Sequence, residues 1–230
     1  MTALSRPNIQ LAASVTRRVE VTQVRTVKAV VHACDESVER TPPTKPFVRW
    51  AGGKTRLLES ILPYIPEAFV NYHEPFLGSG AVFFAAHSRA SGVCLLSDLN
   101  SELVNAWNVV RSCPDDLIAA LAEFKGRDSE EDYYVIRSLA PTGSVERAAR
   151  FFYLNQTSWN ALWRVNRWGV FNVPWGARKF RGFEEAELKR ASRALAGVGV
   201  VEQDFRAALE KVGPGDFVCP SSEHLAQLAA

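Results

Sequence analysis

Cysteine, histidine and long hydrophobic runs are all sparse in this chain of 230 residues. The four cysteines form no Cys-x-x-Cys pair, which argues against a structural zinc site and against a disulfide scaffold. The four histidines are also dispersed, and isolated histidines are more often structural than metal-binding. No apolar run approaches the roughly 18 residues that a membrane span needs. The sequence therefore predicts a soluble, cytoplasmic protein with no bound metal and no membrane partner.

The overall composition is that of a globular protein. Hydrophobic residues make up 47% of the chain and charged residues 23%, which suffices to bury a core. This length suits one domain with an insertion, or two small domains. The net charge of +2 points to no class of partner by itself.

Residues 1–44 differ from the rest of the chain. Valine recurs there without a clean helical or strand period, and a Thr-Pro-Pro-Thr-Lys-Pro linker follows at residues 41–46. The segment carries arginines and few acids before Asp35, a composition that a transit peptide also has. We favour a poorly ordered N-terminal extension over a transit peptide.

A glycine-containing turn at residues 74–80 is the most informative local pattern. A short apolar run at 68–72 precedes it, a helical pattern over 81–86 follows, and a second apolar run at 93–97 ends at Asp98. Glycine lets the backbone approach a ligand closely, and the free N–H groups of the helix point back at the turn. This order of strand, glycine turn, helix, strand and acid is typical of ribose-binding Rossmann-like units, although such turns also serve packing alone.

Strand and helix patterns continue to alternate, which favours an α/β fold with a parallel sheet. Two further strands are predicted at residues 198–202 and 215–219. About 90 mainly helical residues separate the second and third strands, far more than an ordinary connection of about 2 to 6 residues. We therefore predict an α/β domain formed by residues 45–104 and 197–230, interrupted by a helical insertion over residues 105–196.

The insertion contains a basic and aromatic stretch. Its basic residues are Arg137, Arg147, Arg150, Arg164, Arg167, Arg178, Lys179 and Arg181, against the single acid Glu146. Tryptophan and asparagine are interleaved with these charges. Arginine can neutralise phosphates, amides can bind adenine edges, and aromatic rings can stack where a base is displaced. Any one of the aromatic residues could equally be helical core, but the charge asymmetry favours DNA as the partner.

A Gly-Gly-Lys-Thr run at residues 52–55 suggests a phosphate-binding loop, yet that loop needs a glycine where Val48 stands, so we do not expect ATP binding. The surrounding motifs instead resemble DNA adenine-N6 methyltransferases of the Dam type, the D12 class, from about residue 47 to 218. The resemblance is carried by Trp-Ala-Gly-Gly-Lys at 50–54, Glu-Pro-Phe-Leu-Gly-Ser-Gly at 74–80, Ser-Asp-Leu-Asn at 97–100, Phe-Phe-Tyr-Leu-Asn at 151–155, Trp-Asn-Ala-Leu-Trp-Arg-Val-Asn at 159–166 and Phe-Asn-Val-Pro-Trp-Gly at 171–176.

This resemblance implies a Rossmann-like fold and methyl transfer from S-adenosyl-L-methionine to adenine N6 at specific sites in double-stranded DNA. The implied cofactor-binding residues are Trp50, Lys54, Glu74, Phe76, Gly78, Gly80, Asp98, Asp204 and Phe205. Among them, Lys54 would bind the methionine carboxylate and Asp98 the ribose hydroxyls, while Asp204 and Phe205 would hold the adenine of the cofactor. The insertion would be the target-recognition domain, with Arg137, Asn155, Trp159, Asn160, Arg164, Asn166 and Arg167 contacting DNA.

One motif of the family is missing. Asp-Pro-Pro-Tyr should follow the fourth strand, where it would bind the adenine amine and stack the flipped base, but the sequence continues from Cys219 as Cys-Pro-Ser-Ser. We therefore assign no catalytic residue, and we expect a truncated or frame-shifted monomer without the C-terminal strands. Three alternatives stay open: an inactive remnant that keeps cofactor or DNA binding, a subunit that borrows the missing part from a partner chain, and a nucleotide-binding enzyme that does not act on DNA. A restriction system, a phage and a housekeeping role are all compatible with this sequence.

Overall fold

A parallel β-sheet forms the centre of the computed structural model, which describes residues 44–221. Its strands are β1 (Tyr72–Glu74), β2 (Cys94–Asp98), β3 (Gly199–Glu202) and β4 (Phe217–Val218). They lie in the order β3-β2-β1-β4, and each neighbouring pair is parallel. The predicted α/β class with a parallel sheet is confirmed. The predicted extension over residues 1–44 lies, apart from Thr44, outside the described residues.

The strand order places the carboxyl ends of β1 and β4 side by side. The chain builds outward from β1 to β2 and β3 on one side, then crosses to add β4 on the other side of β1. Ligands of open α/β sheets bind at such a reversal, outside the carboxyl ends of the strands. The topology therefore predicts that a ligand site is formed by the residues that follow β1 and β4.

Three of the predicted strands match the structure closely, but the first was misplaced. Residues 68–72 were expected to form it, whereas β1 begins only at Tyr72 and continues to Glu74. Before it, Phe69 makes an isolated bridge with Ala90. The polar residues that close β1 are almost fully buried, because the sheet is covered there, and a pattern of apolar residues alone cannot indicate such a strand.

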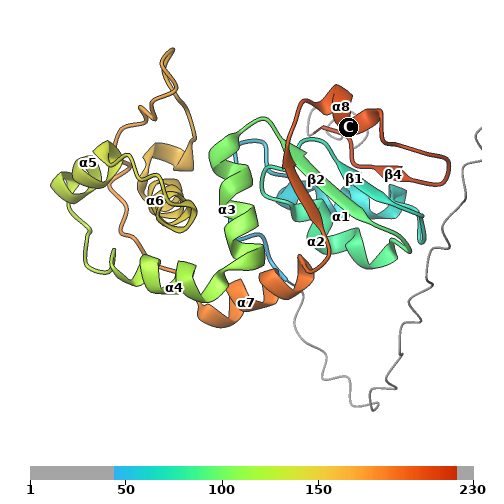
Figure 1. The fold of residues 1–230 in the computed structure, drawn as a ribbon, viewed down its shortest axis with the longest axis horizontal. Helices are drawn as coiled ribbons and strands as arrows, with labels where there is room; N and C mark the ends of the chain where they lie inside the picture. The colour runs from blue at the N-terminus through green and yellow to red at the C-terminus, as the bar shows by residue number, and fades with distance from the viewer. Residues whose placement is uncertain (1–43, 222–230) are drawn as a thin grey trace, which may run out of the picture. The chain divides into compact units, whose positions relative to one another are not determined.

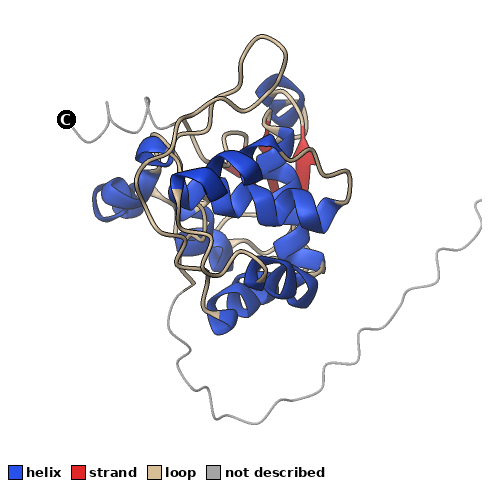
Figure 2. Ribbon diagram, turned by 90° about the vertical axis from the view of Figure 1, so that its left-hand side faces the viewer, coloured by secondary structure: helices blue, strands red, loops and turns tan. Residues whose placement is uncertain are grey.

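Helices surround this sheet and make up most of the insertion between β2 and β3 (Figure 2). The α-helices are α1 (Leu58–Ile61), α2 (Ala81–Ala86), α3 (Ser101–Ser112), α4 (Pro114–Ala122), α5 (Glu130–Ser138), α6 (Ser144–Thr157), α7 (Glu185–Ala194) and α8 (Phe205–Leu209). Single 3-10 turns occur at Lys54–Leu57, Leu62–Tyr64, His87–Arg89 and Trp159–Ala161. The carboxamide of Asn100 caps α3 by accepting a hydrogen bond from the Leu103 N–H over 3.0 Å. That cap starts α3 directly after β2.

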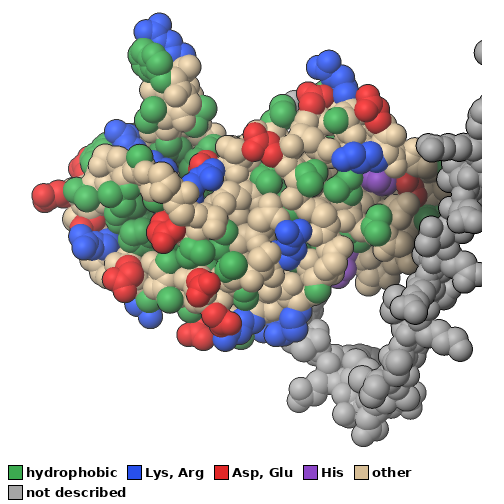
Figure 3. Space-filling model, in the orientation of Figure 1, with side chains coloured by type: hydrophobic (Ala, Val, Ile, Leu, Met, Phe, Trp, Pro, Cys, Tyr) green, Lys and Arg blue, Asp and Glu red, His purple; other side chains and the backbone are tan. Residues whose placement is uncertain are grey.

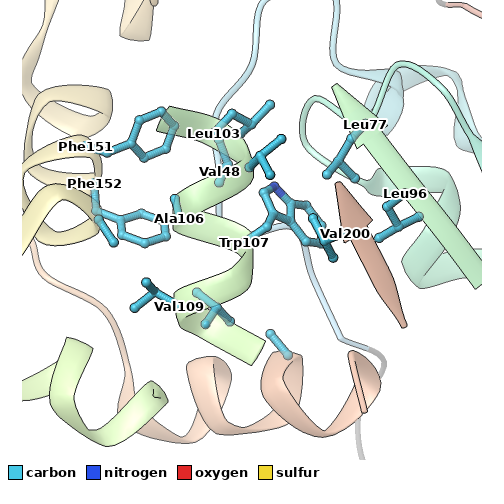
Figure 4. Packing of buried hydrophobic residues seen from close by; sticks show 14 of the residues in the cluster. Val48, Leu77, Leu96, Leu103, Ala106, Trp107, Val109, Phe151, Phe152 and Val200 are labelled. Carbon is cyan, nitrogen blue, oxygen red and sulfur yellow. The ribbon is translucent and has the colours of Figure 1, made fainter. Parts of the chain in front are cut away.

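Helix α3 joins the sheet to the insertion (Figure 1). Its Trp107 is fully buried and stacks on Phe84 of α2, with ring centroids 5.6 Å apart. On the other side of α3, the buried rings of Phe151 and Phe152 extend from α6 (Figure 4). The apolar core is therefore continuous from the sheet through α3 to α6, which fixes the orientation of the insertion helices.

A buried polar cluster fastens the turn before β4 to β1. Asp216 accepts hydrogen bonds from the backbone N–H and the side-chain amide of Asn71, over 3.1 and 2.8 Å, and its other oxygen lies 2.9 Å from His73 Nε2. The Gly213 N–H also donates to this carboxylate. That backbone hydrogen bond, together with those from His73 and Asn71, holds the pKa of Asp216 below its ordinary value.

We expect this cluster to make folding stability depend on acid pH. Because the pKa of Asp216 is lower in the folded chain than in the unfolded chain, its contribution is complete above about pH 4 and is lost as pH falls below that value. An Asp216→Asn variant should therefore be less stable at pH 7, and its free energy of unfolding should fall less steeply as the pH is lowered. Urea unfolding from pH 7 to pH 3 measures both effects. Asp115→Asn, which removes an exposed carboxylate of α4, is the matched control; equal pH profiles for native protein and Asp216→Asn would contradict the prediction.

Candidate functional site

A cavity of about 790 Å³ lies at the carboxyl ends of the strands. Its walls come from residues 50–54, from residues 74–79 after β1, from Asp98 at the end of β2, and from residues 218–221 at β4. Phe205 and Leu209 of α8 also contribute to the wall. A cavity of this size is within the range of small-ligand sites. Its position agrees with the reversal in strand order between β1 and β4.

The turn after β1 supplies the floor of this cavity. Gly78 has a φ of +48°, and its N–H donates to the Asp98 carboxylate over 3.2 Å. A Cβ atom at Gly78 would lie 2.8 Å from Cδ1 of Trp50, which is too close. Glycine is required at this position because it brings the backbone against the indole that forms the wall above it.

Gly80 has a different role from the one predicted. It does not line the cavity; it caps α2 with a φ of +63°, and a Cβ atom there would collide with the ring of Trp107. The predicted contact of Gly80 with a ligand is therefore replaced by a packing role. Its lack of a side chain lets α2 and α3 approach each other under the turn.

The deepest polar group of the cavity is a buried ion pair. Lys54 Nζ donates to Glu74 Oε1 over 3.2 Å and to the Phe76 carbonyl over 3.4 Å. The side chains of Lys54 and Glu74 are only 5% and 1% exposed. Burial by itself would lower the pKa of Lys54, but the neighbouring Glu74 and Cys219 together outweigh burial, so the pKa of the ammonium is raised.

Two further residues complete the hydrogen bonding of Glu74. The Tyr72 hydroxyl donates to Oε2 over 2.8 Å, and the Cys219 thiol lies 3.7 Å from Oε1. Burial raises the pKa of both groups, and the neighbouring Glu74 charge adds to the effect, so tyrosine and cysteine remain protonated donors. Sequence reasoning missed Tyr72, although its position two residues before Glu74 puts both side chains on one face of a strand.

Asp98, at the end of β2, also lines the cavity. Its Oδ2 accepts from the Gly78 N–H, and its Oδ1 accepts from the Asn100 N–H over 3.0 Å. A carboxylate offers about four acceptor positions, so two remain for hydroxyl groups of a ligand. The rings of Phe76 and Phe205 stack nearby, with centroids 5.6 Å apart, and both are partly exposed.

Seven of the predicted cofactor-binding residues line the cavity together: Trp50, Lys54, Glu74, Phe76, Gly78, Asp98 and Phe205. Asp204 does not. Its Oδ1 caps α8 by accepting from the Arg206 N–H over 2.9 Å, and it also lies 3.3 Å from the Arg206 guanidinium. Helix capping is a common use of an acid at this position, and it takes Asp204 away from the cavity wall.

The segment between α6 and α7 brings most of the predicted DNA-contacting residues together. Bridges between Ser158 and Trp175 and between Val165 and Phe171 fold it into a hairpin, which we call the 158–175 hairpin. It stands out from the surface in Figure 3, with hydrophobic side chains and cations at its tip. Trp159 is 56% exposed, and Trp168 is 70% exposed.

Local hydrogen bonds shape this hairpin. The Asn166 carboxamide accepts from the backbone N–H groups of Trp168 and Val170, which closes the tip. Arg164 donates to the Asn172 carboxamide over 2.9 Å, and Asn160 adopts a left-handed φ of +53°. The guanidinium of Arg167 lies 4.1 Å from the ring centroid of Trp168. The exposed arginines and aromatic rings are thus presented on a single projecting element.

Two residues of the predicted DNA-contacting set are placed elsewhere. Arg137 on α5 donates to the Val173 carbonyl over 3.1 Å, so it supports the base of the hairpin. Asn155 is 2% exposed, and its carboxamide binds the backbone N–H and carbonyl of Arg49 over 3.0 and 2.7 Å. Because the side chain is buried and both of these hydrogen bonds are directed inward, we withdraw Asn155 as a DNA contact.

The described part of the chain can be compared with two predictions from the sequence, that no metal is bound and that no segment spans a membrane. Within residues 44–221, no three His, Cys, Asp or Glu side chains gather in a way that could hold a metal ion. Over the same residues, no helix has the length and apolar character that crossing a membrane requires.

Comparison with known proteins decides the family. The family model of D12 class N6 adenine-specific DNA methyltransferases matches residues 50–219, which include every wall of the cavity except its last two residues, and also the 158–175 hairpin. The chain belongs to this family. The cavity and the hairpin thus lie in the same region that matches the D12 family.

Individual D12 relatives agree with this assignment. The chain is 36% identical over 183 residues to the type II methyltransferase M1.LlaDCHI of Lactococcus lactis subsp. cremoris, covering 76% of this chain and 63% of the relative. It is 37% identical over 193 residues to M.MjaIII of Methanocaldococcus jannaschii, covering 76% and 67%. It is 34% identical over 171 residues to a DNA adenine methylase of Haemophilus influenzae, covering 72% and 59%. The chain thus spans roughly three fifths to two thirds of the length of these relatives.

Proposed function

We propose that this chain is a site-specific DNA adenine-N6 methyltransferase that binds S-adenosyl-L-methionine in the cavity at the ends of the strands. The observation that carries the proposal is the convergence of Lys54, Glu74 and Asp98 on one cavity within the region that matches the family. The proposal includes the domain division predicted from the sequence, a Rossmann-like methyltransferase domain over residues 45–104 and 197–230 with a recognition insertion over residues 105–196.

The polar groups of the cavity match the two ends of this cofactor. Lys54 can bind the methionine carboxylate by a charge-assisted hydrogen bond, and Asp98 can accept the ribose hydroxyls. Trp50, Phe76 and Phe205 offer aromatic surface for the adenine ring. When bound, the cofactor supplies an electrophilic methyl group, and the chain's own residues fix where that group lies.

The 158–175 hairpin is proposed as the DNA contact. Its exposed residues Trp159, Arg164, Arg167 and Trp168 combine positive charge with aromatic surface, the pairing that DNA backbone binding and base displacement require. Asn160 and Asn166 shape the hairpin, and Arg137 supports its base.

Removing the hairpin cations should weaken DNA binding in a salt-dependent way. Arg164→Ala and Arg167→Ala should each lower the affinity for duplex DNA and reduce the slope of log K against log salt by about 1. Fluorescence anisotropy over a series of salt concentrations measures both quantities. Arg193→Ala removes an exposed cation of α7 and serves as the control; an equal loss in all three variants would argue against a specific role of the hairpin.

A second function is supported by the residues that follow β4. Cys219, Pro220 and Ser221 line the cavity there, and Asp-Pro-Pro-Tyr occurs nowhere in the 230 residues. A chain that binds cofactor and DNA without transferring the methyl group is the alternative that this observation favours. A partner chain that supplies the missing motif would reconcile both functions, with β4 at the sheet edge of the described residues as the place of attachment.

Transfer of a labelled methyl group separates these functions. The purified chain is incubated with labelled S-adenosyl-L-methionine and adenine-containing duplex DNA, and Asp98→Ala is tested in parallel. If the native chain transfers the labelled methyl group to DNA and Asp98→Ala does not, the chain is a methyltransferase and the inactive remnant is excluded. Cofactor binding by calorimetry without incorporation would support the second function. A native chain that binds no cofactor would overturn both.

A further inference from the structure

Tyr72 carries a hydroxyl group that its packing does not require. Its side chain is fully buried behind the cavity, and it forms none of the cavity wall. The ring packs against those of Phe69, Phe83 and Phe217, with centroid distances of 6.0, 6.0 and 5.8 Å. A phenylalanine would make the same ring contacts, so the hydroxyl needs a separate explanation.

That explanation is the second carboxylate oxygen of Glu74. The Tyr72 hydroxyl donates to Glu74 Oε2 over 2.8 Å, while Oε1 receives the Lys54 ammonium and lies near the Cys219 thiol. A buried carboxylate with an unpartnered oxygen is unfavourable and tends to rotate toward other donors. The thiol is a weak donor on the other oxygen, so it does not replace the tyrosine.

The orientation of Glu74 in turn decides where Lys54 points. An ammonium group has three N–H donors, and two of those of Lys54 bind Glu74 Oε1 and the Phe76 carbonyl. The remaining donor can then be directed into the cavity that Lys54 lines. If Glu74 rotates, the stem of Lys54 must follow, because both side chains are almost fully enclosed.

We infer that Tyr72 is a positioning residue for the amino-acid end of the cavity's ligand, acting through Glu74 on the Lys54 ammonium. The inference rests on the proposed function, since it assumes a ligand with a carboxylate at Lys54. It adds a specificity determinant outside the cavity wall. The adenosine end of the ligand lies beyond this chain of contacts and should not depend on Tyr72.

Two ligands that differ only at the amino-acid end test this inference. S-adenosylhomocysteine carries the amino-acid group, and 5′-methylthioadenosine lacks it. By calorimetry on the full chain, Tyr72→Phe should lower the affinity for S-adenosylhomocysteine about ten-fold while leaving the affinity for 5′-methylthioadenosine unchanged. Tyr133→Phe is the matched control, because the buried Tyr133 hydroxyl also makes a 2.8 Å hydrogen bond, to the Val173 carbonyl away from the cavity. Thermal unfolding checks that each variant is folded.

A double variant shows whether the effect passes through Lys54. If it does, Tyr72→Phe combined with Lys54→Gln binds S-adenosylhomocysteine no more weakly than Lys54→Gln alone. Additive losses, equal effects on both ligands, or no effect of Tyr72→Phe would overturn the inference while leaving the proposed function intact. A native chain that binds neither ligand would overturn the proposed function and this inference together. Lys54→Gln with Tyr72 intact still gives a result if Tyr72→Phe fails to fold: undiminished binding of S-adenosylhomocysteine would overturn the inference.

Discussion

Lys54→Met should destabilise the folded chain by about 3 to 5 kcal/mol, because it leaves the Glu74 carboxylate buried without its cation. The two side chains are 5% and 1% exposed, so little water reaches Glu74 to replace the lost ammonium group. The variant should also lose binding of S-adenosyl-L-methionine. Urea unfolding at pH 7 gives the change in the free energy of unfolding.

Two further variants isolate the cause. Lys54→Met combined with Glu74→Gln removes both charges and should recover most of the stability but not the cofactor binding. Lys189→Met breaks the ion pair between Lys189 and Asp115, whose side chains are 43% and 79% exposed, and should have little effect. A double variant as unstable as Lys54→Met would show that lost packing, not the unpaired charge, dominates.

Gly80→Ala should cost about 3 kcal/mol or more, the sum of a left-handed backbone strain and an overpacked core. Gly80 has a φ of +63°, and its missing side chain makes room for the fully buried ring of Trp107. Any Cβ atom forces α2 away from α3, so the turn that forms the cavity floor should shift as well. We expect weaker cofactor binding together with a lower midpoint of urea unfolding.

Gly126→Ala provides the matched comparison for the backbone term alone. Gly126 has a φ of +78°, and no atom lies within 4 Å of a Cβ built on it. Its substitution should therefore cost only about 1 kcal/mol and leave cofactor binding unchanged. If both glycine variants lose the same stability, the contact with Trp107 carries no cost and the packing argument fails.

The cavity was predictable to a large extent from local sequence. A glycine turn after one strand and an acid at the end of the next place Gly78 and Asp98 at the same edge of a parallel sheet, and their 3.2 Å hydrogen bond confirms it. Asp204 lies outside the cavity wall because an acid before a short helix serves equally as a cap or as a ligand-binding group. Gly80 also lies outside it, because positive φ is needed for packing as well as for ligand approach.

The residue types of the insertion indicated DNA binding, but the sequence did not show which of these side chains face outward. Asparagine and arginine between tryptophans indicated DNA, and the exposed 158–175 hairpin presents Arg164 and Arg167 accordingly. Asn155 belongs to the same composition and is directed into the core, where it binds the backbone of Arg49. Sequence spacing gives the face of a helix, whereas the neighbour of that face depends on how distant segments pack.

The sequence by itself determined the α/β class and the turn and acid that line the cavity, because these depend on short spacings within single strand-turn-helix units, while the family and the lysine followed from the resemblance of whole motifs. Only the tertiary structure decided how Lys54, Tyr72 and Cys219 converge on Glu74. Lys54 and Cys219 are separated from Glu74 by 20 and 145 positions, so no local pattern relates them. Cys219 reaches Glu74 because parallel β1 and β4 lie side by side in the sheet, and Lys54 reaches it from the 3-10 turn Lys54–Leu57; pairing and packing across such separations are fixed by the whole core.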